Sequence, residues 1–308
     1  MRILVLTLFA LLTACTASRK TTDNDNWCAS KCDAAGDEHQ NTSEIFECMK
    51  SDSIMDAVMN EPELKFPLRF GIVTSDPAIN KIDELVIQKA IENLNQAFRE
   101  TSLAFYLDQI DYIPSGLKIE DLSRNAYEAY EQFSKLHDKP DRISVFIFEH
   151  RGDFCEISPS SISCARTGGF SYILSTHTKN IVLSHFDLEE PKIVAHEFGH
   201  FFGLYHTFEE AQFGKDTFNP NTCAETGDRI CDTPPDPGAV FEIYVNYSTC
   251  EMKGYFNGNG QEYKPLIDNY MSYYKPCYLK EYSFTPGQIL VLRVSGHSTL
   301  RKPFSRQE

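Results

Sequence analysis

The residues best suited to chemistry are two histidines and a glutamate near the middle of the chain, in the segment His196-Glu197-Phe198-Gly199-His200. Histidines four residues apart project from one face of an α-helix, about 6 Å apart along its axis, so both imidazoles can bind one zinc ion. Glu197 is adjacent and can polarise a water molecule. A helix with two surface histidines gives the same short pattern, so the residues that follow decide its meaning.

The following residues supply a third ligand. Gly203 can end the helix, because glycine adopts the left-handed conformation without steric cost, and His206 can then turn back toward the pair. Three protein ligands leave a fourth position open for water, which is the arrangement of catalytic rather than structural zinc. The sequence therefore predicts His196, His200 and His206 as ligands of one catalytic Zn²⁺ and Glu197 as the general base.

The extended motif resembles the metzincin metallopeptidases, and a second passage supports the resemblance. Metzincins carry a downstream Met-turn beneath the zinc histidines, and the Asn-Tyr-Met-Ser-Tyr segment that begins at Asn269 fits it. A buried methionine in a tyrosine-rich loop is ordinarily a core residue, so the passage gains its meaning from the zinc motif before it. The resemblance implies that Met271 forms the apolar floor and that Tyr273 faces the metal, where its hydroxyl would stabilise an oxyanion.

Within the metzincins, the chain resembles the pappalysin family most closely. The stretch from Gly227 to Pro235, Gly-Asp-Arg-Ile-Cys-Asp-Thr-Pro-Pro, is similar to that family's Gly-Asp-x-x-x-Asp-Thr-Pro segment. An ordinary turn with an aspartate cap has the same composition. Since pappalysins of this type often bind calcium, the resemblance implies Asp228 and Asp232 as possible Ca²⁺ ligands. It covers residues 66 to 300, roughly.

The resemblance also implies two disulfides in the second half of the chain. They would join Cys223 to Cys250 and Cys231 to Cys277. The spacing of four cysteines leaves all three possible pairings open.

The ten cysteines of the chain are typical of an oxidising compartment. Cys155 and Cys164 bracket a serine-rich loop and are predicted to form a disulfide. Cys28, Cys32 and Cys48 are an odd number, so one could bind the zinc and hold the enzyme latent, as in some metzincins. None of the three has the neighbouring Gly or Arg of the pappalysin switch, however.

One departure from the family concerns substrate preference. Bacterial pappalysins that cleave before basic residues have an acidic residue just before the last cysteine, whereas Lys275-Pro276 precede Cys277 here. An unpaired like charge in a buried pocket is costly, so we do not expect a preference for basic side chains.

The amino terminus predicts export. Residues 1–14 have a positive start and an apolar run too short to span a membrane, as in a signal peptide. Leu12-Thr13-Ala14-Cys15 also resembles the lipobox of bacterial lipoproteins, so Cys15 is the predicted lipidation site, followed by a flexible tether through residue 27. We therefore expect a lipoprotein of the bacterial cell envelope or surface; the alternative is a plain signal and a secreted protein.

Composition excludes several partner classes. The 308 residues are 42% hydrophobic, enough for one large core or two packed lobes, and 44 acidic against 29 basic residues give a net charge of −15. This balance argues against nucleic acid, and against membrane contact other than through the lipid anchor. It leaves the oligomeric state open.

The hydrophobic pattern places these residues in an α+β fold. Residues 28–65 form a possible pro-segment or N-terminal clasp, residues 66–302 the catalytic domain, and residues 303–308 a tail. Alternation predicts strands at 68–72, 103–107, 143–148, 172–174 and 180–183, and helical spacing predicts helices at 82–97, 126–136, from 191 and from 286. We expect a metzincin-like zincin with an upper lobe (about 66–205) that holds a twisted mixed sheet and the zinc helix. The lower lobe (about 206–302) would be loop-rich and disulfide-bonded, with a C-terminal helix that opens with a capping box at Thr285.

Together these features predict a zinc-dependent endopeptidase that hydrolyses extracellular or envelope polypeptides. Gly168–Ser171 could present an edge strand to an extended substrate, and a plain glycine turn is an equal alternative. The alternative function is a surface-anchored, zinc-containing binding or scaffold lipoprotein without proteolytic activity. Glu197 argues against it, because a structural zinc site has no use for that carboxylate.

Overall fold

The architecture is that of a computed structural model, which describes residues 45–50, 52–78, 82–118, 127–149, 152–158, 161–167, 169–171, 173, 179–209, 222–277, 280–298 and 301–305. The predicted signal peptide, Cys15 and the tether lie outside these residues. Within them, none of the helices has both the length and the apolar character needed to cross a bilayer.

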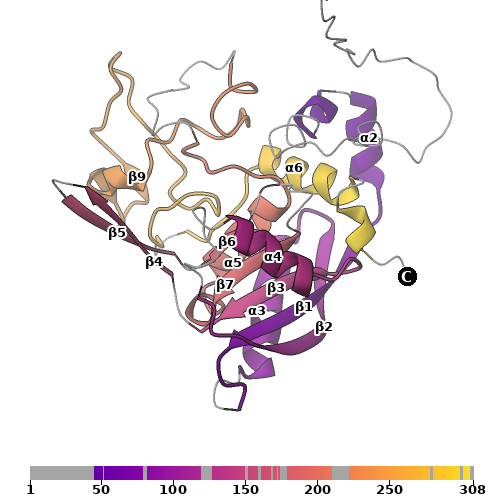
Figure 1. The fold of residues 1–308 in the computed structure, drawn as a ribbon. Helices are drawn as coiled ribbons and strands as arrows, with labels where there is room; N and C mark the ends of the chain where they lie inside the picture. Colours follow the sequence, from indigo (N-terminus) through magenta and orange to yellow (C-terminus); the bar gives the residue numbers. More distant parts are fainter. Residues whose placement is uncertain are drawn as a thin grey trace, which may run out of the picture.

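The centre of the molecule is a five-stranded sheet in the order β2-β1-β3-β7-β6 (Figure 1). The first four strands are parallel, and β6 joins β7 in the antiparallel direction. Their bounds are β1 Leu64–Thr74, β2 Leu103–Pro114, β3 Ile143–Phe148, β6 Gly169–Ser171 and β7 Asn180–Ser184. Every residue of β3 and β7 is buried, as expected of central parallel strands covered on both faces.

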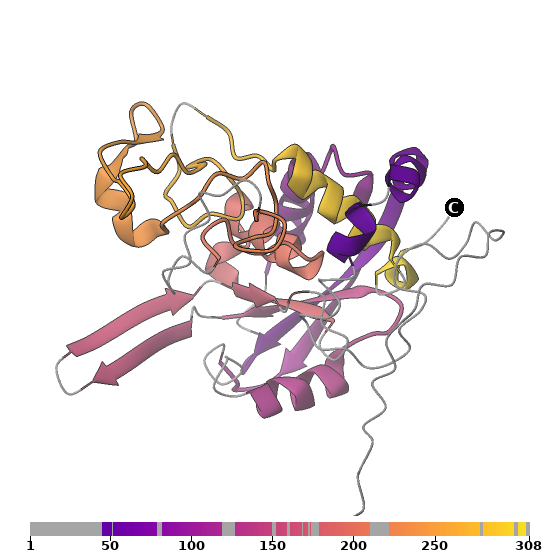
Figure 2. The ribbon, with the colours of Figure 1, turned by 90° about the horizontal axis from the view of Figure 1, so that it is seen from above.

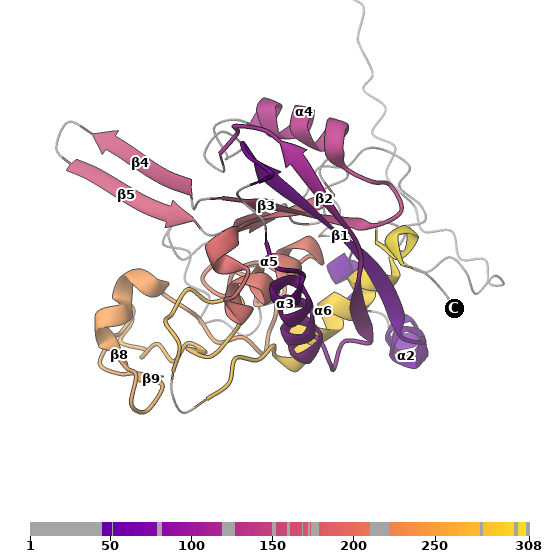
Figure 3. The same ribbon diagram turned by 90° about the horizontal axis from the view of Figure 1, so that it is seen from below.

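Helices cover both faces of this sheet. Helix α4 (Tyr127–His137) lies on one face, and α3 (Glu84–Ala97), α5 (Pro191–Phe201) and α6 (Pro286–His297) lie on the other (Figure 3). Asp83 caps α3 by accepting a hydrogen bond from the amide of Leu85, and Thr285 forms the predicted capping box of α6.

The core between α5 and the sheet is rich in phenylalanine. The Phe105 ring of β2 lies edge-on to Phe98, at 5.3 Å, and to Phe198 of α5, at 5.0 Å. The rings of Phe66 and Phe202 complete the cluster. Since Phe198 lies within the histidine motif, this apolar packing fixes the zinc helix against the sheet.

Several predicted elements are confirmed, and others are wrong. The strands at 68–72, 103–107, 143–148 and 180–183 and all four helices are present, with β2 extending to Pro114. Of the strand predicted at 172–174, only Ile173 is described, and it lies in a turn; the chain pairs earlier, at Gly169–Ser171. The hairpin of β4 (Gly152–Ser158) and β5 (Ser161–Thr167) was not expected, and it projects from the body of the molecule (Figure 2).

The amino-terminal segment packs against the carboxy-terminal helix. Helix α2 (Asp52–Asn60) lies beside α6, where Arg293 Nη2 donates hydrogen bonds to the carbonyl oxygens of Val58 and Met59. Ile45 and Phe46 are buried in the same core. The assignment of residues 28–65 as a pro-segment or an N-terminal clasp stays a prediction.

The lower lobe has little regular structure, and its predicted disulfide pairing is wrong. Before α6, its described elements are the 3₁₀ helix η5 (Ala239–Tyr244) and the short strands β8 (Val245–Asn246) and β9 (Glu251–Met252). Instead of Cys223–Cys250 and Cys231–Cys277, the disulfides join Cys223 to Cys231 and Cys250 to Cys277, with Cα atoms 5.0 and 5.7 Å apart.

The local fold of the loop explains this pairing. Gly227 and Arg229 both have a φ of 63°, and these left-handed residues turn the chain so that Cys231 returns beside Cys223. Cysteine spacing carries no information about such a reversal. Cys155 and Cys164 are Cα partners in the β4–β5 ladder, but their side chains lie outside the described residues, so that disulfide stays a prediction.

Candidate zinc site

Helix α5 positions the first two histidines as predicted. Pro191 opens the helix and Phe201 ends it, and Gly203 follows in the left-handed region with a φ of 100°. The amides of Gly203 and Leu204 donate to the carbonyl oxygens of His200 and Gly199, at 2.9 Å each. The chain then reverses and carries His206 back toward the helix.

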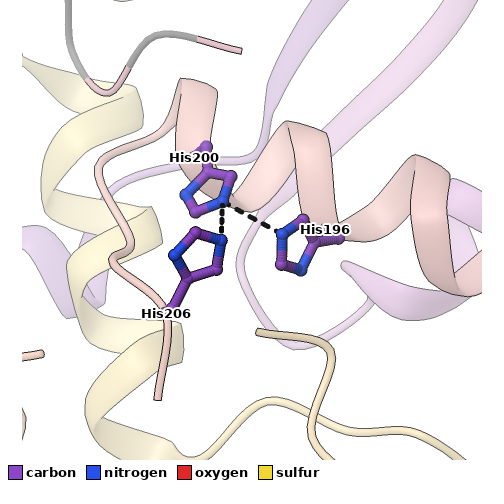
Figure 4. A group of neighbouring side chains, drawn as sticks. All are labelled: His196, His200 and His206. Carbon is purple, nitrogen blue, oxygen red and sulfur yellow. Dashed lines mark hydrogen bonds between the residues drawn. The ribbon is translucent and has the colours of Figure 1, made fainter. Parts of the chain in front are cut away.

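The three histidines converge through their Nε2 atoms (Figure 4). His200 Nε2 is 3.0 Å from His196 Nε2 and 3.0 Å from His206 Nε2. Nitrogens that share one tetrahedral zinc ion are about 3.3 Å apart, so this spacing fits the metal. Within the described part of the chain, these residues are the one group of three or more potential ligands whose donor atoms converge.

Hydrogen bonds at the Nδ1 atoms of His196 and His200 determine which ring nitrogen of each carries the proton. His196 Nδ1 is 2.8 Å from the Tyr270 carbonyl oxygen, and His200 Nδ1 is 2.7 Å from the Leu204 carbonyl oxygen. Because a carbonyl oxygen only accepts, both Nδ1 atoms carry protons and both Nε2 atoms present lone pairs. Two lone pairs that face each other repel unless a cation lies between them, so the donor set fits zinc.

The protonation of the site agrees with this role. Burial, reinforced by the neighbouring His206, lowers the pKa of His196 to about 3, so the imidazole stays neutral, as a metal ligand must be. His206 is less buried, and its Nδ1 lies 3.4 Å from Glu209 Oε2. Glu209 thus orients the third imidazole, a function that the sequence did not reveal.

Glu197 lies within the same helix turn as the ligands and is buried. Its Oε2 atom has no hydrogen-bond partner among the described residues. Burial, and then the nearby charge of Asp187, raises the pKa of this carboxyl to about 8. A buried carboxylate oxygen without a partner costs free energy in a purely structural role, but it is suited to accept a proton from water.

The predicted Met-turn lies directly beneath the zinc helix. A Cβ atom added to Gly199 would lie 2.5 Å from the Met271 sulfur, so only glycine allows this approach. Met271 is fully buried. The central glycine of the histidine motif therefore has a packing function that the sequence alone did not assign.

The start of helix α6 holds the Met-turn in place. Asn269 Oδ1 accepts hydrogen bonds from the amide of Met271, at 2.8 Å, and from Gln288 Nε2, at 3.1 Å. Gln288 Oε1 in turn accepts from Asn269 Nδ2 and from the amide of Thr285. The capping glutamine of α6 thus also anchors the turn under the metal site.

Tyr273 stands beside the histidines, as the resemblance implied. Its ring centroid is 4.8 Å from that of His206 and 5.5 Å from that of His196, and the residue is 56% exposed. Phe208 stacks on His206, with centroids 4.7 Å apart, and its ring also contacts Tyr273, with centroids 4.7 Å apart. Tyr273 is therefore both close to the ligands and open to an incoming substrate.

The two aspartates predicted as possible calcium ligands have different environments. Asp232 accepts from the Thr285 hydroxyl and the Gly287 amide, at 2.7 and 2.8 Å, and so caps α6. Asp228 Oδ1 accepts from the Thr233 hydroxyl and the Ile230 amide, and its buried Oδ2 has no hydrogen-bond partner among the described residues. The structural function of Asp232 is thus explained without a metal, and calcium at this loop stays a prediction.

The amino-terminal cysteines are only partly described. Cys48 is disulfide-bonded, so it is not available as a zinc-binding thiolate. Cys28 and Cys32 lie outside the described residues.

Comparison with known proteins adds a family to this geometry. Residues 176–295, which hold the three histidines and the Met-turn, match the family model described as pregnancy-associated plasma protein-A. An extracellular metalloprotease of Neurospora crassa is 26% identical over 270 residues, covering 83% of both chains. Another, of Arthroderma gypseum, is 26% identical over 237 residues, covering 71% of this chain and 68% of its own.

A solved structure has a similar fold. A promirolysin mutant of Tannerella forsythia superposes with a TM-score of 0.57 at 15% identity, covering 87% of this chain and 90% of its own. At this identity the similarity concerns the fold, and it agrees with the predicted metzincin architecture of a mixed sheet above a loop-rich lobe.

Proposed function

Since the chain belongs to the pappalysin family of metzincin zinc metallopeptidases, we propose that it is an exported endopeptidase with Glu197 as general base and Tyr273 as oxyanion donor. The observation that carries the proposal is the convergence of three imidazole Nε2 atoms beside the unpartnered Oε2 of Glu197. Zinc held by His196, His200 and His206 would acidify a water molecule and polarise the scissile carbonyl.

In the proposed mechanism, Glu197 moves the protons. Its carboxylate accepts a proton from the attacking water and then donates it to the nitrogen of the departing amine. The burial that raises the pKa of Glu197 also favours the protonated form that the second transfer needs. The Tyr273 hydroxyl donates a hydrogen bond to the oxyanion as the carbonyl becomes tetrahedral.

The sheet offers a place for an extended peptide. Strand β6 is the last strand of the sheet, and a Cβ atom added to Gly169 would lie 3.3 Å from Glu197 Cγ. The backbone of β6 is therefore next to the proposed general base. We infer that a polypeptide substrate lies along this strand, which would bring a peptide bond to the zinc site.

The decisive test is Glu197→Gln in the chain from Thr16 onward, incubated with a denatured protein mixture. The amide keeps the size of the side chain but cannot accept the proton, so we expect cleavage to fall about 1,000-fold or more. Zinc content after dialysis should match the wild type, because the ligands are intact. Cleavage sites are mapped by mass spectrometry, with and without a zinc chelator.

Glu92→Gln is the matched control, since Glu92 is an exposed residue of α3 paired with Lys89. It should cleave as the wild type does. Substantial chelator-sensitive hydrolysis by Glu197→Gln would refute the general base. A wild type that binds zinc but cuts nothing would support the binding or scaffold lipoprotein instead.

We further propose export to the cell envelope or surface. The relatives are named extracellular metalloproteases, and this chain begins with residues suited to a signal peptide and to lipidation at Cys15. Oxidised pairs such as Cys250–Cys277 agree with an oxidising compartment.

The mapped cleavage sites also test the substrate preference. Lys275-Pro276 occupy the position where the relatives that prefer basic side chains have an acidic residue, and the Lys275 ammonium forms an ion pair with Glu242. We therefore propose that basic side chains are not preferred after the cleaved bond.

A further inference from the structure

A buried carboxylate of the lower lobe connects two loops of the zinc site. Asp236 is 4% exposed, and its two oxygens accept three hydrogen bonds. Oδ2 accepts from the Thr207 hydroxyl at 2.6 Å, and Oδ1 accepts from the Tyr274 hydroxyl at 2.7 Å and from the Gly238 amide at 2.8 Å.

The two hydroxyl donors directly follow the residues that would do chemistry. Thr207 follows the third zinc ligand, His206, and Tyr274 follows Tyr273. Among the described residues neither loop belongs to a helix or a strand, and the Met-turn loop has one isolated β-bridge, between Asn269 and Ser283. One backbone bond joins them, from the Thr207 amide to the Met271 carbonyl oxygen at 3.2 Å.

The zinc helix reaches the same cluster through Lys192. Its ammonium donates a hydrogen bond to the Tyr274 carbonyl oxygen and lies 4.6 Å from the centroid of the Tyr282 ring. Burial raises the pKa of Asp236, and the positive charge of Lys192 partly opposes this shift. Helix α5, the His206 loop and the Met-turn loop are thus tied together by one buried network, in which each hydrogen bond supports the others.

We propose that Asp236 is a positioning residue that sets the His206 loop against the Tyr273 loop, so that the third ligand and the oxyanion donor face one reaction centre. This proposal rests on the zinc endopeptidase function proposed above. Oδ2 of Asp236, through Thr207, positions the metal ligand His206. Oδ1, through Tyr274, positions the oxyanion donor Tyr273.

Single-atom variants separate the effects of the two oxygens. Thr207→Val keeps the shape of the side chain but removes the hydroxyl, and Tyr274→Phe does the same on the other side. We expect Thr207→Val to weaken zinc affinity about 10-fold or more, the size typical of lost support for a metal ligand. Tyr274→Phe should lower kcat several-fold while zinc affinity and KM change little.

Asp236→Ala removes all three hydrogen bonds to the carboxylate, and Asp236→Asn serves as the conservative variant. Zinc affinity is measured by chelator competition, and the ligand geometry by the visible absorption spectrum of the Co²⁺-substituted protein. We expect Asp236→Ala to lose about 10- to 100-fold in zinc affinity and to change the Co²⁺ spectrum, and Asp236→Asn to recover part of both. Asp138→Ala is the control, because it removes a partly buried, hydrogen-bonded carboxylate that lies beside α4 and β7 and contacts none of the residues of this network.

The outcomes are distinguishable. If the Asp236 and Thr207 variants unfold at a lower temperature but keep wild-type zinc affinity, Co²⁺ spectrum and kcat, the residue is merely structural and the proposal is overturned. If Asp236→Ala does not fold, the Thr207→Val and Tyr274→Phe pair decides alone. Absence of cleavage by the wild type would refute the endopeptidase, whereas zinc affinity and the Co²⁺ spectrum would still test the positioning of His206.

Discussion

The two lobes are stabilised in different ways, although they meet at one zinc site. The upper lobe consists of long parallel strands and helices, with an apolar cluster on each face of the sheet, and all six residues of β3 are buried between them. The lower lobe has only two-residue strands among its described residues. Individual contacts hold it together: two disulfides, the buried carboxylates of Asp228 and Asp236, and stacked rings such as Phe241 and Tyr255.

The two lobes also supply different residues to the zinc site. The upper lobe supplies His196, His200 and Glu197 from one rigid helix. The lower lobe supplies His206 and Tyr273 from loops whose positions depend on side-chain hydrogen bonds. Loops can vary in sequence while the zinc helix stays in place, so this arrangement suits a peptidase that cleaves different polypeptides.

The largest effect on this comparison is expected from Phe105→Ala. The ring lies in the upper-lobe cluster against Phe98 and Phe198, and truncation there leaves a cavity. We expect the free energy of unfolding in urea to fall by about 4 kcal/mol, with loss of order in the zinc helix as well as in the sheet. Leu85 is 69% exposed, so Leu85→Ala should lower the free energy of unfolding by less than about 1 kcal/mol, as is typical of surface substitutions. A similarly small loss for Phe105→Ala would show that the apolar core is not what stabilises the upper lobe.

A second effect should be confined to the lower lobe. Replacing both Cys250 and Cys277 with serine opens a loop spanned by 27 residues, and the entropy of that loop in the unfolded chain is worth about 3.5 kcal/mol. Hydrogen exchange should accelerate in residues 239–277 while β1 and β3 stay protected.

The matched control is the other disulfide. Replacing Cys223 and Cys231, only 8 residues apart, should cost about 2.5 kcal/mol by the same reasoning. Equal acceleration of exchange in β1 and β3 would show that the lobes unfold as one unit, and the contrast between them would then fail.

The same contrast decides how much of the molecule the sequence could predict. Hydrophobic periodicity located β1, β3, β7 and α3 because a buried strand or helix repeats its pattern along the chain. The histidine spacing indicated the metal ligands, because helix geometry alone places His196 and His200 together. These features depend on residues close together in the chain, so the local sequence is enough to predict them.

The disulfide pairing and the Asp236 contacts of the lower lobe could not be predicted, because the sequence patterns do not report the backbone conformation or the long-range contacts on which they depend. The disulfide pairing depends on the left-handed residues Gly227 and Arg229, and the spacing of cysteines does not report them. Asp236 lies between two prolines, a composition that indicates only a turn. Its contact with Thr207 spans 29 residues, and nothing in the sequence joins such distant positions.

A last expected effect, on the pH dependence of stability, concerns Asp138, a partly buried carboxyl group of the upper lobe. Its oxygens accept from Asn180 Nδ2 at 2.9 Å, yet burial raises the pKa of Asp138 to about 6 from an ordinary value near 3.8. Because the folded carboxyl binds its proton more tightly than the unfolded one, its contribution to stability is complete below pH 4 and is lost as the pH rises through 6.

Asp138→Asn should therefore remove part of the pH dependence of unfolding between about pH 4 and 6, by at most about 3 kcal/mol. Urea unfolding at both pH values measures this slope, and Glu92→Gln, an exposed change, should leave it unaltered. If Asp138→Asn keeps the wild-type slope, the hydrogen bonds from Asn180 stabilise the ionised form of Asp138 in the folded protein. Both lobes would then use a hydrogen-bonded carboxylate as a structural element, and they would differ only in how much regular backbone structure they contain.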